Sequence, residues 1–91
     1  MKRKEILESA IKQIDGSREN DYGKVENNFG LIGLLWTAYL NTLVTAKDVA
    51  LMMCLLKIAR CKNGGGTGDS YVDLAGYAAC AGDIAPGKVE G

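Results

Sequence analysis

Residues 45–61 read TAKDVALMMCLLKIARC and predict a helix with a well-marked start. Thr45 stands three positions before Asp48. The side chain of each residue can therefore accept a hydrogen bond from the backbone N–H group of the other, as in a capping box. From residue 49 to residue 58, every side chain except that of Lys57 is apolar. Because a helix that is apolar on all sides is normally covered on all sides, we expect this helix at the centre of a helical fold.

Three further helices are expected around this segment. Apolar residues recur at three- and four-residue spacing in residues 3–14, and again from about residue 29 to a helix end near Thr42. An alanine- and glycine-rich helix is expected from Asp69 to Ala81. No segment alternates apolar and polar residues as a strand does, so the sequence predicts an all-α fold, a compact bundle of about four helices.

The connections are predicted from residues that favour turns. Asp15-Gly16 is expected to end the first helix, because glycine readily takes the left-handed conformation. The polar stretch 17–28 is expected to be an ordered loop, with Asn27 or Asn28 capping the next helix. The glycine-rich residues 63–68 are expected to be a flexible connector, since ordering glycine costs the most backbone entropy.

Ninety-one residues are enough for one domain only. We assign residues 1–83 to a single helical domain and residues 84–91 to a flexible C-terminal tail. The longest uncharged run, which begins at Asn27, contains glycines and polar residues and falls short of the ~20 apolar residues of a membrane span. The N-terminal residues lack the apolar core of a signal peptide, so a cytoplasmic location is expected.

Charge and cysteine content exclude several functions. Eleven basic and eleven acidic side chains cancel, which argues against general nucleic-acid binding and against duplex binding above all. The three cysteines form no C-x-x-C pair and the chain has no histidine, so neither a zinc site, a disulfide framework nor a histidine-dependent nucleophile fits. Any chemistry must therefore come from carboxylates, a metal ion, lysine or arginine.

Lys57 and Arg60 are the leading candidates for ligand binding. A lysine inside an apolar helix is costly unless an anion meets it. That anion is either a carboxylate, Asp73 or Asp69, or the phosphate group of a ligand, which both bases suit. Further candidates for the same site are bases, an amide and aromatic rings that could stack on a nucleobase, although a lone tryptophan is more often a core residue. They are Arg18, Lys24, Asn28, Tyr22, Trp36, Tyr39 and Tyr77.

Asp69 and Asp73 are the candidate metal ligands. They lie four residues apart and so project from one helix face, where two carboxylates could share a Mg²⁺ ion with a nucleotide's phosphate oxygens. The structural alternative is that Asp69 is favoured by the helix dipole and that Asp73 pairs with a base. The preceding glycine run lacks the lysine and the preceding strand of a P-loop, so a linker is at least as good an explanation.

A homo-oligomer is the expected completion of the bundle. A chain this short gains little stability from its own core, and the last helix offers small residues that let helices approach closely. In the alternative, Met52, Met53 and Cys54 fill the core of a monomer.

Four motifs follow one another along nearly the whole chain: Asp21-Tyr22-Gly23, Leu35-Trp36-x-Ala38-Tyr39-Leu40, Leu55-Leu56-Lys57-Ile58-Ala59-Arg60 and Asp69-Ser70-x-x-Asp73-x-Ala75-Gly76-Tyr77. Together they resemble a family of small, uncharacterised bacteriophage proteins. More distantly, the last motif is similar to the Mg²⁺-binding helix of MazG-like all-α nucleotide pyrophosphohydrolases, which pair an E-x-x-E helix with an E-x-x-D helix. Ser70 replaces the first glutamate of E-x-x-D, and no E-x-x-E occurs on the second expected helix.

The resemblance implies a connection with nucleotides and leaves three functions open. The first is a phage nucleotide-binding protein that sequesters a nucleotide-derived immune signal in the host cytosol, an anti-defence sponge. The second is a Mg²⁺-dependent pyrophosphohydrolase in which Asp69, Asp73 and Asp48 or Glu26 hold the metal. The third is a protein-interaction module. We favour the first and assign no catalytic residue, because bases and aromatics are present while the carboxylates are too few for the MazG pattern.

Overall fold

A computed structural model describes residues 1–14, 25–64 and 68–84, which form four helices and contain no strand. In chain order these are α1 (Arg3–Ile14), α3 (Val25–Leu40), α4 (Ala46–Lys62) and α5 (Gly68–Asp83). The prediction of an all-α bundle with four helices is confirmed for these residues.

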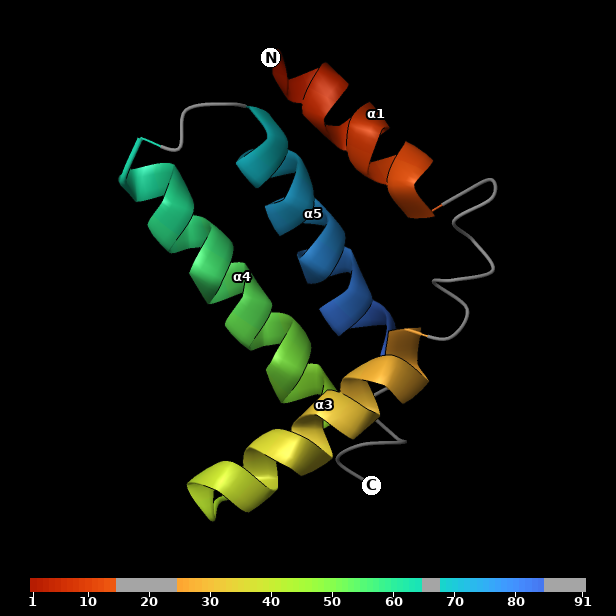
Figure 1. The fold of residues 1–91 in the computed structure, drawn as a ribbon. Helices are drawn as coiled ribbons and strands as arrows, with labels where there is room; N and C mark the ends of the chain where they lie inside the picture. Colours follow the sequence, from red (N-terminus) through yellow and green to blue (C-terminus); the bar gives the residue numbers. More distant parts are fainter. Residues whose placement is uncertain (15–24, 65–67, 85–91) are drawn as a thin grey trace.

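The helices are arranged around α5 and α4, which run antiparallel side by side (Figure 1). Helix α1 lies along α5 on the side away from α4, and α3 crosses the pair near the start of α4. Within residues 1–14, 25–64 and 68–84, no helix lies across the outward side of α4 (Figure 1).

The core forms where α3, the first half of α4 and the end of α5 meet. Its buried members are Phe29, Val44, Val49, Ala50, Cys80, Ala81 and Ile84, and half-buried Ile32, Trp36, Ala46, Met53 and Tyr77 pack against them. Ile84 is only 3% exposed, and its N–H group continues the helix bonding to the Cys80 carbonyl at 3.0 Å. The residue after α5, which the sequence assigned to the tail, therefore contributes to the core.

The start of α4 has the predicted capping box. The Asp48 N–H group donates to Thr45 Oγ1 at 3.1 Å, and the Thr45 N–H group donates to Asp48 Oδ2 at 3.0 Å. Just before this cap, the Thr37 hydroxyl accepts from the Val44 N–H group at 2.8 Å and donates to the Val44 carbonyl at 3.3 Å. These bonds fix the end of α3 against the start of α4.

Several predicted boundaries were wrong. Helix α3 begins at Val25, so the expected loop does not reach Asn28, and Asn27 and Asn28 belong to the helix instead of capping it. The prediction followed apolar residues, whereas the first turn of a helix tolerates polar ones. At its other end α3 stops at Leu40, because Asn41 takes a left-handed conformation with φ of 56°.

The other two predicted helices differ less from the structure. Helix α4 ends at Lys62, one residue later than predicted, and α5 includes Gly68 and extends to Asp83. Residues 15–24 and 65–67, where further turns were expected, lie outside the described residues.

The single chain alone does not cover α4 on all sides. Only Val49 and Ala50 are buried, whereas Leu51, Leu55 and Ile58 are 45%, 64% and 48% exposed. Two neighbouring helices, α3 and α5, cover one side of α4 and leave the other open. None of the described helices has the length and hydropathy needed to cross a membrane.

Candidate functional site

An ion pair joins α4 to α5 at the centre of the candidate site. Lys57 Nζ lies 3.1 Å from Asp73 Oδ2, and the two side chains are 16% and 33% exposed. Of the two carboxylates that the sequence offered as partners for Lys57, the structure thus selects Asp73. The lysine side chain is largely buried, and a partner of opposite charge offsets the cost of desolvating its ammonium group.

The antiparallel register of α4 and α5 explains this pairing. Cys54 Sγ lies 4.0 Å from the Leu74 carbonyl oxygen. Cys54 is one turn before Lys57 on α4, and Leu74 directly follows Asp73 on α5, so the two ion-paired residues lie at the same level. One turn beyond Lys57, the same register brings Arg60 level with the first turn of α5, where Asp69 stands. Arg60 and Asp69 are both exposed. Two bases on α4 therefore lie opposite two acids on α5 at the end of the helix pair farthest from the core.

The metal-binding candidates supply fewer carboxylates than a MazG-like site requires. Asp69 lies in the first turn of α5 and Asp73 already holds Lys57. Ser70, at the position of the missing glutamate, is buried with 6% exposure. Within residues 1–14, 25–64 and 68–84, no three histidine, cysteine, aspartate or glutamate side chains come together as a metal site.

Asp48, a candidate fourth ligand, is exposed and caps the start of α4. It lies nine residues before Lys57, about 13 Å along the helix. The side chain of Glu26, the other candidate, is not among those described.

Two of the aromatic candidates belong to the core and not to an open binding face. Tyr77 stacks obliquely on Phe29, with ring centroids 6.2 Å apart and an angle of 31°, and packs against the core with Trp36. Both side chains are half-buried. Tyr77 is nevertheless one turn from Asp73 on α5.

The other ligand-binding candidates are scattered or lie outside the description. Asn28 is exposed on α3, and Tyr39 is 87% exposed near the end of the same helix. Arg18, Tyr22 and Lys24 fall outside the described residues. Among the described candidates, therefore, the structure brings Lys57 and Asp73 into contact, and the helix register places Arg60 and Asp69 one turn farther along the same helix pair.

The cysteines are free thiols, with Cys80 buried and Cys54 and Cys61 half-buried. Burial raises the pKa of the Cys54 thiol above its ordinary value. Burial, and then the nearby Asp83 and Cys54, raise the pKa of the Cys80 thiol. Raised pKa values keep these two thiols protonated and poorly nucleophilic at neutral pH, as expected of packing residues.

The sequence reasoning missed one feature, the exposed apolar side of α3. Leu31, Leu34 and Leu35 are 56%, 67% and 60% exposed. The predicted apolar face of this helix included Leu35 but neither Leu31 nor Leu34. The sequence could have predicted this exposed side, because the spacing of the three leucines places them on the side of the helix opposite Phe29.

Comparison with known proteins identifies the family. Residues 5–85 match the family described as domain of unknown function DUF6378. The chain belongs to DUF6378. Over 86 residues it is 45% identical to the Gene 55 protein of Mycobacterium phage D29, covering 94% of this chain and 57% of that protein. Over 74 residues it is 47% identical to the Gene 55 protein of Mycobacterium phage L5, covering 80% of this chain and 47% of that protein.

This DUF6378 chain therefore spans about half the length of the curated relatives it matches. No solved structure matches it. The resemblance to an uncharacterised family of phage proteins is confirmed.

Proposed function

We propose that this DUF6378 protein is a phage-encoded nucleotide-binding protein in which Lys57 and Arg60 hold the phosphate groups of the ligand. Sequestering a nucleotide-derived signal of host immunity, as an anti-defence sponge in the host cytosol, is the biological role we favour. The observation that carries the proposal is the Lys57–Asp73 ion pair, in which a lysine side chain only 16% exposed meets a carboxylate between two helices.

The ion pair would position the Lys57 ammonium group to bind a phosphate group. Asp73 fixes the ammonium in place, and a phosphate with more than one negative charge competes well with a single carboxylate for it. Arg60, one turn away and exposed, adds a planar group able to bond two phosphate oxygens. A Mg²⁺ ion bound by Asp69 and Asp73 would neutralise part of the ligand's charge and be completed by water and phosphate oxygens.

We expect binding without turnover. Hydrolysis in the MazG manner needs carboxylates to hold Mg²⁺ and activate water, and the described cluster supplies two while Ser70 occupies the place of a third. The alternative, a Mg²⁺-dependent MazG-like pyrophosphohydrolase, requires further carboxylates from Glu26 or from a second copy of the chain.

We also propose that the protein works as a homo-oligomer. Large apolar side chains are exposed along both α3 and α4, with Leu34, Leu35 and Leu55 each at least 60% exposed. Apolar patches of this kind usually mark an interaction surface. If the partner were a different protein, the same surface would support the third reading, a protein-interaction module.

A thermal-shift screen tests ligand binding directly. The protein is heated with nucleoside triphosphates, nucleoside monophosphates and cyclic nucleotides, each with and without Mg²⁺. A ligand at about a hundred times its dissociation constant adds about 2.7 kcal/mol, and each kcal/mol raises the Tm of so small a domain by roughly 4–8 °C. We expect Arg60→Ala to lose most of the shift, and Lys62→Ala, an exposed base two residues away, to keep it.

Two results would contradict the proposal. One is the absence of a shift with every nucleotide tested, and the other is an equal shift in the Arg60→Ala and Lys62→Ala variants. Chromatography of the ligand after incubation separates binder from enzyme. Unchanged nucleotide is expected, whereas release of pyrophosphate that Asp73→Asn abolishes would establish the hydrolase instead.

A further inference from the structure

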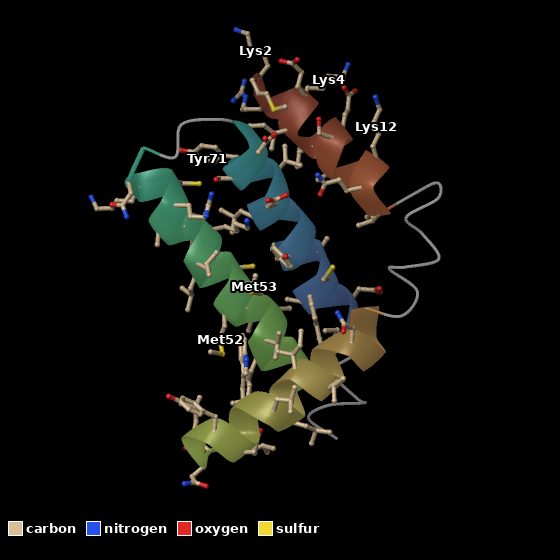
Figure 2. All side chains as sticks on the ribbon, in the orientation of Figure 1. Lys2, Lys4, Lys12, Met52, Met53 and Tyr71 are labelled. Atoms are coloured by element: carbon tan, nitrogen blue, oxygen red, sulfur yellow. The ribbon has the colours of Figure 1, made fainter. Side chains whose placement is uncertain are left out.

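The outward side of α4 carries a regular stripe of exposed residues. Leu51, Leu55 and Ile58 are spaced by four and three residues and are 45%, 64% and 48% exposed. Met52 and Leu56 extend the apolar surface on one flank, with 38% and 47% exposure. Figure 2 shows Met52 on the side of α4 away from α5. The spacing is that of the contact positions of a coiled coil, in which one helix packs lengthwise on another.

A charged residue of opposite sign stands at each end of this stripe. Asp48 precedes Leu51 by three residues and Lys62 follows Ile58 by four, and both charged side chains are exposed. Positions 48, 51, 55, 58 and 62 are thus separated alternately by three and four residues and lie on one side of the helix. At 1.5 Å per residue this stripe is about 21 Å long. Leu55 is its midpoint, seven residues from either charge.

This pattern is complementary to itself when one copy is reversed. In an antiparallel pair of α4 helices related by a two-fold axis at Leu55, Asp48 of each copy faces Lys62 of the other. Leu51 of each copy then packs beside Ile58 of the other, and the two Leu55 side chains meet on the axis. In a parallel pair, by contrast, like charges face each other at both ends, which disfavours association.

We infer that this protein forms a two-fold symmetric dimer through an antiparallel pairing of α4 with α4 of a second copy. The inference rests on the self-association proposed above and names the surface that makes it. The exposed side of α3 is the competing surface. It carries Leu31, Leu34 and Leu35 but no charged residue between Leu31 and Leu40, so nothing along it selects a second copy or an orientation.

The self-contact at Leu55 provides a sharp test. Leu55→Glu and Leu55→Lys each place two like charges on the axis and remove two leucines from the interface. Each variant alone is expected to weaken dimerisation more than about a hundredfold and to scatter light as a monomer. An equimolar mixture of the two is expected to recover a dimer, because the new carboxylate of one copy then faces the new ammonium group of the other. Leu34→Glu on α3 is the matched control, since Leu34 is 67% exposed and Leu55 64%. It is expected to remain dimeric.

The failures of this test are distinguishable. A monomeric unaltered chain would overturn the proposed self-association and this interface with it. A dimeric unaltered chain whose Leu55 variants also remain dimeric, or whose mixture stays monomeric, would overturn only the α4 pairing. Loss of the dimer in Leu34→Glu alone would place the interface on α3. Because residue 55 is exposed, circular dichroism of every variant should show the helix content of the unaltered protein.

Discussion

The two sides of α4 differ in the size of their apolar side chains and in their surroundings. The inward side, which packs on α3 and α5, carries the small residues Val49 and Ala50, each 0% exposed, and the Lys57 ion pair. The outward side carries larger apolar groups, including Leu51 and Leu55. A monomer stabilised by its own core would be expected to bury its largest apolar side chains. The reversed distribution is what the proposed association through the outward side would explain.

The largest expected difference between the two sides comes from burying a charge. Val49→Asp places a carboxylate where no water reaches, and we expect it to cost on the order of 4 kcal/mol or more and to leave the chain largely unfolded. Leu51→Asp, two residues away on the outward side, should cost the folded monomer less than about 1 kcal/mol. Urea unfolding followed by circular dichroism measures both, at protein concentrations low enough for the chain to be monomeric. Similar losses in the two variants would mean that the sides are not distinct.

A pair of glycines makes the same comparison on α3. A Cβ added at Gly33 would lie 2.6 Å from the Val44 carbonyl oxygen, whereas one added at Gly30 meets nothing within 4 Å. Gly33→Ala must therefore displace the connection to α4, and we expect a loss of about 1–3 kcal/mol in the free energy of unfolding. Gly30→Ala should instead gain up to about 1 kcal/mol, because alanine favours the helix. A stabilising Gly33→Ala would contradict the close packing of α3 on that connection.

Much of the fold could be predicted from local patterns, because caps and periodic apolar residues act over a few positions. The Thr45–Asp48 box gave the start of α4 correctly, and the spacing in residues 3–14 gave α1. The exposure of Leu55 could not be predicted in this way. Whether an apolar side is covered depends on how many other helices reach it, and a chain of this length has too few to surround α4.

The ion pair on the inward side is expected to have a moderate effect. Lys57→Ala and Asp73→Ala each leave a partly buried charge without its partner, and the double variant removes both. A double-mutant cycle should give a coupling of about 1 kcal/mol, larger than for most exposed pairs because Lys57 is only 16% exposed. A coupling of zero would show that Asp73 does not hold the lysine in solution.

Alkaline pH provides the smallest expected effect and tests the inward packing of Cys80. The pKa of its thiol is raised above the ordinary value of 9.0, first by burial and then by Asp83 and Cys54. Below that value the thiol is protonated in both the folded and the unfolded chain, so its contribution is complete. As the pH rises beyond it, the unfolded thiol ionises first and the folded state loses stability. Cys80→Ala should flatten this alkaline fall in Tm, and an unchanged slope would contradict the assignment.

The candidate site was predictable only as a set of residue types. Lysine in an apolar helix indicated a buried anion, and the structure supplied Asp73 because α4 and α5 are antiparallel in a register that no local pattern reveals. Trp36 and Tyr77, chosen as base-stacking candidates, pack against the core instead, since large aromatics gain most from burial. Asp69 and Arg60 come level with each other only through the same register.

The proposed dimer covers the outward side of α4 with a second copy of the chain. Sedimentation equilibrium of the unaltered chain over a range of concentrations measures this directly, because it gives the mass in solution without assuming a shape. The account predicts twice the mass of the single chain, with dissociation to the monomer only on dilution. The mass of a single chain at every concentration would contradict it.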